Sequence, residues 1–271
     1  MNDRTRGALD GQGENPQAPQ KKVPDPAREA LETQARQLNE EFASLTADER
    51  IRRAHEIFGR ELVATTSFGR DAGLLLHHLH RVDVPIRVYF IDTSFHFPET
   101  LAYRDTLTSA YKLDLNEVRS ADPTNRRYSS TNPDGDRRSG DFTLSISDTV
   151  ACCGVNKVAV QAAFLGRTDV KAFLAGLRRD QSDSRKETPF VHVQKGKIKI
   201  CPFADWPQDD VELYLKIWEV PEHPLAAQGY TSIGCSPITC TQKPAGAGDS
   251  RSGRWAGDAK TECGLHTDYE P

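Results

Sequence analysis

The chain has 271 residues, of which 37% are hydrophobic and 27% are charged, an ordinary composition for a protein of one large or two small domains. Its formal net charge of −4 argues against a nonspecific nucleic-acid binder, because such proteins carry a strong basic excess. No stretch approaches the roughly 20 apolar residues needed to cross a bilayer, and no apolar segment follows the first residues. We therefore expect no membrane partner, no secretory signal and a cytoplasmic location.

Three regions are expected along the chain. Residues 1–25 are rich in Gly, Pro, Gln, Asn and charge, so they are expected to be a disordered N-terminal segment. Residues 26–245 should form an α/β domain that opens with two helices, from Pro26 and after Thr46, whose hydroxyl can cap the second. Residues 246–271 are expected to be a mobile C-terminal tail.

Strands and helices alternate within the domain. The hydrophobic pattern predicts strands at 61–66, 86–91, 113–118, 170–177, 190–193 and 197–201, and helices at 71–80, 98–111, 155–165 and 209–218. This alternation predicts a parallel-rich sheet flanked by helices. A polar loop from about 120 to 140 is long enough to be either mobile or functional.

The first strand runs into a turn that carries Ser67, Gly69 and Asp71 before the next helix. A small hydroxyl residue and a glycine at a helix N-terminus allow backbone N–H groups to face an anion, although an ordinary strand-to-helix turn explains the pattern equally well. The turn resembles the modified phosphate loop of adenine nucleotide alpha-hydrolase-like proteins. Phe68 and Ala72 replace the glycine and serine of the ATP-cleaving members, and this departure favours the branch that reduces phosphosulfates.

The six cysteines suggest a metal centre. Cys152 and Cys153 are adjacent, and Cys235 and Cys240 follow about eighty residues later. Four thiolates suit either zinc or an iron–sulfur cluster, and buried free thiols are the alternative. Adjacent ligands favour a 4Fe–4S cluster, because neighbouring side chains can reach different iron corners. Cys201 lies on an apolar strand and is expected to be structural.

The chain is identified as a member of the assimilatory adenosine 5′-phosphosulfate (APS) reductase family from about residue 61 to 266. The segments that carry the resemblance are Ser67-Phe68-Gly69, Tyr89–Thr93, Phe97–Thr100, Cys152-Cys153 with Lys157, Gly176–Ser182, Ala204–Trp206, Gly229–Cys235, Arg251–Trp255 and Glu262–His266. One departure concerns the second cysteine pair, which normally has two residues between the ligands. Here four residues separate Cys235 from Cys240, and we expect the extension to bulge outward.

The resemblance implies thioredoxin-dependent reduction of APS to sulfite and AMP in sulfate assimilation and cysteine biosynthesis. Cys263 would be the catalytic nucleophile and would carry an S-sulfocysteine intermediate. A reduced thioredoxin or similar thiol donor would be the partner, and a homo-oligomer is left open. The resemblance makes the four clustered cysteines the ligands of a 4Fe–4S cofactor. The residues expected to bind substrate are Ser67, Gly69, Asp92, Thr93, Lys157, Arg178, Arg185, Arg251, Arg254 and His266.

Three alternatives remain at this point. The substrate could be the 3′-phosphorylated nucleotide (PAPS), or the enzyme could accept both. The chain could instead be a non-catalytic iron–sulfur sensor that binds a nucleotide, but such a sensor would not need the cysteine-bearing tail. A sulfur-transferring or adenylating ligase would need ATP, and the altered phosphate turn disfavours it.

Overall fold

The computed structural model describes residues 25–121, 148–236, 238–244, 250–255, 260 and 262–266. The segment expected to be disordered lies outside the described residues except for its last residue, Asp25. Nearly all of the polar loop expected at 120–140 lies outside them as well. Within the described part of the chain, no helix combines the length and apolar character that a membrane crossing requires.

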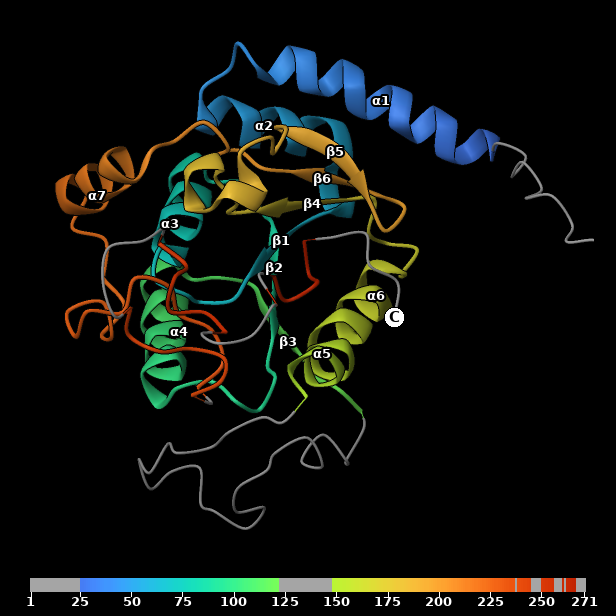
Figure 1. Ribbon diagram of the computed structural model, residues 1–271. Helices are drawn as coiled ribbons and strands as arrows, with labels where there is room; N and C mark the ends of the chain where they lie inside the picture. The colour runs from blue at the N-terminus through green and yellow to red at the C-terminus, as the bar shows by residue number, and fades with distance from the viewer. Residues whose placement is uncertain are drawn as a thin grey trace, which may run out of the picture.

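A six-stranded sheet forms the centre of the molecule (Figure 1). Its strands, in the spatial order β3-β2-β1-β4-β6-β5, are parallel except for β5, which pairs antiparallel with β6. This confirms the predicted parallel-rich sheet. The strand bounds are β1 Leu62–Thr66, β2 Arg87–Ile91, β3 Leu115–Val118, β4 Ala172–Ala175, β5 Val191–Gln194 and β6 Lys197–Ile200.

Helices cover both faces of this sheet (Figure 1). The second helix begins with a capping box, in which the Thr46 hydroxyl accepts from the Glu49 N–H and the Glu49 carboxylate accepts from the Thr46 N–H. The α-helices are α1 Pro26–Phe42, α2 Ala47–Phe58, α3 Ala72–Val82, α4 Pro98–Tyr111, α5 Thr149–Cys153, α6 Ala159–Leu165 and α7 Gln208–Ile217. Shorter turns are η1 Gly59–Glu61, η3 Gly154–Val158, η4 Arg179–Gln181 and η5 Asp183–Arg185.

The two faces of the sheet bury separate apolar clusters. On one face, side chains such as Ala64 and Leu174 pack with α1, α2, α3 and α7 in the larger core. On the other face, Val63 and Phe173 pack with Phe164 of α6. Successive residues of one strand thus enter different cores, as the two-residue period of a strand requires.

The strand order reverses between β1 and β4. The chain builds β1, β2 and β3 outward in one direction and then crosses over to β4 on the other side of β1. Thr65 of β1 pairs with Ala175 of β4, so the carboxyl ends of these strands lie side by side. In open α/β sheets ligands bind at such a reversal, outside the carboxyl ends of the strands.

Candidate active site

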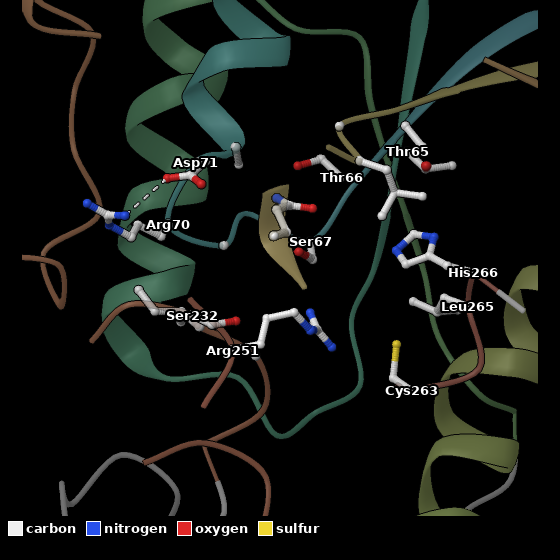
Figure 2. Close-up of a pocket in the computed structure, with 18 of the residues that line it drawn as sticks. Thr65, Thr66, Ser67, Arg70, Asp71, Ser232, Arg251, Cys263, Leu265 and His266 are labelled. Atoms are coloured by element: carbon white, nitrogen blue, oxygen red, sulfur yellow. Dashed lines mark ion pairs between the residues drawn. The ribbon is translucent and has the colours of Figure 1, made fainter. Parts of the chain in front are cut away.

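A cavity of about 210 Å³ opens at this reversal point. Its walls come from the ends of β1 and β4, the turn before α3, the 231–234 loop and two pieces of the C-terminal tail. Figure 2 shows Ser67 and Arg251 in the middle of this space, with Cys263 and His266 on one side. The tail, which is distant in the sequence, therefore closes the cavity over the β1–α3 turn.

The β1–α3 turn has an unusual backbone. Phe68 has a φ of 47°, in the left-handed region that favours glycine. Its N–H donates to Thr66 Oγ1 at 3.1 Å, and its buried ring packs edge-on against Phe90 with centroids 5.2 Å apart. Burial of the ring offsets a backbone strain on the order of 1–2 kcal/mol. Gly69 is also constrained, because a Cβ there would lie 3.1 Å from the Ile233 carbonyl oxygen.

Arg178 contacts this turn through Asp71 but does not line the cavity. Its guanidinium, 1% exposed, donates to Asp71 at 2.8 Å and to Asp180 at 3.0 Å, with a further contact to Gln208. These bonds join the start of α3 to the segment after β4. The sequence analysis placed Arg178 among the substrate-binding residues. In the structure its guanidinium contacts the cavity wall through Asp71.

Asp92 and Thr93 also lie outside the cavity lining. Asp92 pairs with Arg119 at 2.8 Å and accepts from the Ser94 N–H at 2.7 Å. The Thr93 hydroxyl lies 3.3 Å from the Cys235 sulfur. The end of β2 therefore contacts the cysteine region directly.

The cavity is strongly positive. Among the residues that the structure describes, five cationic side chains and one carboxylate, Asp71, line it. Four of the cations are among the predicted substrate-binding residues, and Arg70 is the addition. Such a lining suits a ligand with several negative charges. The five cations are Arg70, Lys157, Arg185, Arg251 and Arg254.

Glu262 joins two of these arginines to the residue before Cys263. Its carboxylate lies 2.8 Å from Arg185 and 3.1 Å from Arg251, and all three side chains are nearly buried. Burial raises the pKa of Glu262, but the two arginines outweigh it, so the net pKa lies below the ordinary value. Burial lowers the pKa of Arg251 to about 10, which still leaves it protonated at neutral pH.

Arg254 connects the tail to the cysteine region. Its Nε donates to the Cys240 carbonyl at 2.9 Å, and its guanidinium lies 4.5 Å from the ring centroid of Trp255. Gly234 makes this placement feasible, because a Cβ there would lie 2.5 Å from Arg254 Cζ. Lys260 adds a further tie by donating to the Thr149 carbonyl, at the start of α5, at 2.7 Å.

Cys263 is the one cysteine of the six that lines the cavity. In Figure 2 its sulfur points into the open space beside Leu265. Burial raises the pKa of this thiol, but Lys157, the Leu265 N–H and Arg254 together lower it below the ordinary value. The following Gly264 has a φ of 82°, and a Cβ there would lie 2.9 Å from Val158 Cγ2.

The other clustered cysteines lie behind the cavity. Cys152, Cys235 and Cys240 share one buried cluster with Trp255. Cys153 is also buried and close enough to act electrostatically on Cys152 and Cys240. Burial, reinforced by the neighbouring thiols, raises the pKa of Cys152 to about 12 and that of Cys240 to about 11.

No group of three or more His, Cys, Asp or Glu side chains in the described residues is arranged around a single metal ion. Cys152, Cys153, Cys235 and Cys240 are all buried, and cysteine thiolates are the side chains that hold iron–sulfur clusters, so the chemistry of these residues fits such a cluster. Ile238, inside the extended cysteine spacing, is half exposed, whereas Cys235 and Cys240 are buried. This agrees with the expected outward bulge.

Lys157 lies between the cysteines and the cavity. It follows Cys152 and Cys153 through the π-helical turn η3, and it lines the cavity although its side chain is nearly buried. Single π-helical turns within a helix are frequent at functional sites. Burial alone lowers the pKa of Lys157, but the thiols of Cys235, Cys153 and Cys263 raise it above its ordinary value.

Several lining residues were not expected from the sequence. Thr65 and Thr66 end β1, so the rule that ligands bind at the carboxyl ends of strands could have found them. His96 was expected to be structural. It lies at the cavity with its Nε2 3.1 Å from the Ile91 carbonyl, and burial lowers its pKa to about 4. Tyr89, Thr231, Ser232 and Ile233 also line the cavity and lie in segments that carry the family resemblance, whereas Gln161 lies outside those segments.

The sequence profile of the phosphoadenosine phosphosulfate reductase domain matches residues 61–243, more than half of the chain. The chain belongs to the phosphoadenosine phosphosulfate reductase family. Among its curated relatives is the adenosine 5′-phosphosulfate reductase of Mesorhizobium japonicum, which is 39% identical over 79% of this chain and 80% of its own length. Another is the phosphoadenosine 5′-phosphosulfate reductase of Gloeobacter violaceus, 35% identical over 89% of this chain and 97% of its own length.

A solved structure agrees with this family assignment. The phosphoadenylyl-sulfate reductase of Candida auris, in a phosphate complex, superposes with a TM-score of 0.60 at 26% identity. The match covers 74% of this chain and 93% of that structure. It confirms the predicted adenine nucleotide alpha-hydrolase-like fold.

Proposed function

We propose that this protein reduces adenosine 5′-phosphosulfate to sulfite and AMP during sulfate assimilation, with Cys263 as the nucleophile. The observation that carries the proposal is the position of Cys263. Its sulfur faces a cavity lined by five cations and by the turn at the end of β1. A nucleophilic thiol beside an anion-binding pocket is what attack on a phosphosulfate requires.

The phosphate group is assigned to the β1–α3 turn. Ser67 and Gly69 line the cavity there, at the N-terminus of α3, where the helix dipole and backbone N–H groups favour negative charge. Lys157, Arg251 and Arg254 are assigned to the sulfate, since they surround the approach to Cys263. Arg185 and His266 complete the wall.

The first half-reaction follows from these positions. The Cys263 thiolate attacks the sulfur atom of the substrate, a sulfur–sulfur bond forms, and the bond from sulfur to the phosphate oxygen breaks. The electron pair of that bond leaves with AMP, whose developing charge is stabilised by the turn before α3. Cys263 is left as S-sulfocysteine.

The second half-reaction needs a dithiol donor. One thiolate of reduced thioredoxin attacks the Cys263 sulfur, and sulfite leaves. Thioredoxin and Cys263 are then joined by a mixed disulfide. The second thiol of the donor then attacks that disulfide and returns Cys263 to the thiolate. The donor supplies two electrons and ends as a disulfide, so the balance closes. Mobility of the 246–271 tail, which stays a prediction, would expose Cys263 to the donor.

The four remaining clustered cysteines are proposed to hold a 4Fe–4S cluster. Cys152, Cys153, Cys235 and Cys240 offer four sulfur donors around one buried region, and a cubane can be reached from separate corners. When bound, the cluster would supply a fixed charge distribution behind Lys157. The chain itself places Lys157 between the cysteines and the substrate.

The test is sulfite release from each nucleotide by anaerobically purified protein with reduced thioredoxin. Cys263→Ser should abolish sulfite while AMP still binds. Cys201→Ala, which alters a buried thiol of the larger core, should retain turnover. Turnover of the 3′-phosphorylated nucleotide alone would replace the proposed substrate, and turnover of both would establish a dual-specificity enzyme. No sulfite from either nucleotide by protein that binds AMP would favour the sensor instead.

A further inference from the structure

A second, smaller cavity lies behind the C-terminal segment. Lys199 of β6 and His192 of β5 line it together with Glu262 of the tail. Arg185 and His266 line both this cavity and the main one. His266 therefore lies between the two cavities and contributes to the wall of each.

Lys199 is an unusual residue for its position. The strand reads Lys-Ile-Lys-Ile, and Ile198 and Ile200 enter the larger core. Lys199 points to the opposite face of the sheet, where it is 0% exposed beside Phe173 and His192 of the neighbouring strands. Burial of an ammonium group is costly unless hydrogen-bond partners surround it, so the contacts of Lys199 indicate what it does.

The Lys199 ammonium meets His266. Its Nζ lies 3.4 Å from His266 Nδ1. An ammonium group has three donors and no acceptor, so the ring nitrogen must be the acceptor in this hydrogen bond. A ring whose Nδ1 accepts carries its proton on Nε2.

The surroundings keep this ring neutral. Burial is the largest cause that holds the pKa of His266 well below its ordinary value, and Lys199, Arg185, Arg251 and His192 act in the same direction. A neutral ring with an acceptor at Nδ1 has one remaining polar function, an N–H donor at Nε2.

We infer that Lys199 is a positioning residue for the reaction, because its ammonium holds His266 as the Nε2–H tautomer with that donor available to an anionic oxygen of the substrate. The inference rests on the proposed function for the identity of the acceptor. The tautomer itself depends only on the Lys199–His266 contact. Lys199 does not line the main cavity and acts through His266.

The direct test is the tautomer of His266, read at neutral pH from its ring ¹⁵N shifts in labelled protein. The signal is assigned by its absence in His266→Ala. The wild-type ring should be neutral and protonated on Nε2. A ring protonated on Nδ1, or on both nitrogens, in the wild-type protein would overturn the inference without any lysine variant.

Three variants extend the test. Lys199→Met removes the donor at similar length, and the ring should then populate the Nδ1–H tautomer while kcat/KM falls at least tenfold. Lys199→Arg retains an N–H donor and should recover the Nε2–H tautomer and part of the turnover. Lys197→Met is the matched control on the same strand, because Lys197 bonds the Arg167 and Val170 carbonyls away from the site and should leave both readouts unchanged.

A double-mutant comparison separates positioning from a general structural effect. In the His266→Ala background, Lys199→Met should cause no further fall in kcat/KM, because the residue it positions is gone. An equal tenfold fall in both backgrounds would refute the inference. If the wild-type protein releases no sulfite, the proposed function fails, but the tautomer measurement still decides the role of Lys199.

Discussion

Replacing Glu262 with glutamine should release the C-terminal segment from the cavity without unfolding the α/β domain. The carboxylate accepts from Arg185 at 2.8 Å and from Arg251 at 3.1 Å, and its side chain is only 11% exposed. Hydrogen bonds to charged groups contribute about 1.5–3 kcal/mol each. Glutamine retains one neutral acceptor and removes the carboxylate charge that the two buried guanidinium groups share.

The net cost of Glu262→Gln to docking of the segment is therefore about 2 kcal/mol, after the partial compensation by the amide. Since 1.4 kcal/mol corresponds to a factor of ten, the undocked population should rise about 30-fold. Amide hydrogen exchange of a peptide that contains Cys263 and Gly264 measures this directly. The matched control is Glu212→Gln, which removes a single exposed carboxylate partner of Arg70.

The pH dependence gives an independent check. The docked pKa of Glu262 lies below the ordinary value of 4.5, so its contribution to docking is complete above about pH 4.5. That contribution is lost as the pH falls through the lower pKa of the docked state. Protection of the wild-type segment should thus decline in acid, whereas the glutamine variant should not show this step. Equal protection from hydrogen exchange in the two proteins at neutral pH would refute the claim that Glu262 holds the C-terminal segment at the cavity.

Three further outcomes are expected. Gly264→Ala should reduce turnover more than tenfold, because its φ of 82° and a Cβ contact of 2.9 Å to a valine oppose any side chain; Gly196→Ala, with a φ of 68° and open space, should not. Arg178→Met should lower the free energy of unfolding in urea by about 3 kcal/mol, since Asp71 and Asp180 lose the buried guanidinium that they share, and an unchanged midpoint would contradict this. Cys240→Ser should lower bound iron and sulfide in anaerobically purified protein, whereas Cys201→Ala should retain both.

The fold could be predicted well because its local signals agree with one another. The helix predicted at 98–111 begins at Pro98 and ends at Tyr111, as observed. The other strands and helices between β1 and α7 are displaced by a few residues at most, except for the helix expected at 155–165. The helical segment there begins earlier, with α5 at Thr149, and the expected range itself is divided between η3 and α6, because a π-helical turn has no simple hydrophobic period.

The site was less predictable, because much of it depends on how distant segments meet. Ser67 and Gly69 follow from the strand-to-helix turn, and Lys157 and Cys263 from the family resemblance. Nothing in the local sequence around Arg178 shows that Asp71, distant along the chain, takes its guanidinium. Similarly, the pairing of Glu262 with two arginines appears only once the described tail residues pack over the cavity.

The most direct test of the central claim is the mass of Cys263 after a single turnover. Anaerobic protein mixed with APS and no thiol donor should gain one sulfo group, located on the peptide that contains Cys263, and should release one equivalent of AMP. Addition of reduced thioredoxin should then remove that group as sulfite. A sulfo group on any other residue, or sulfite release by Cys263→Ser, would contradict the account.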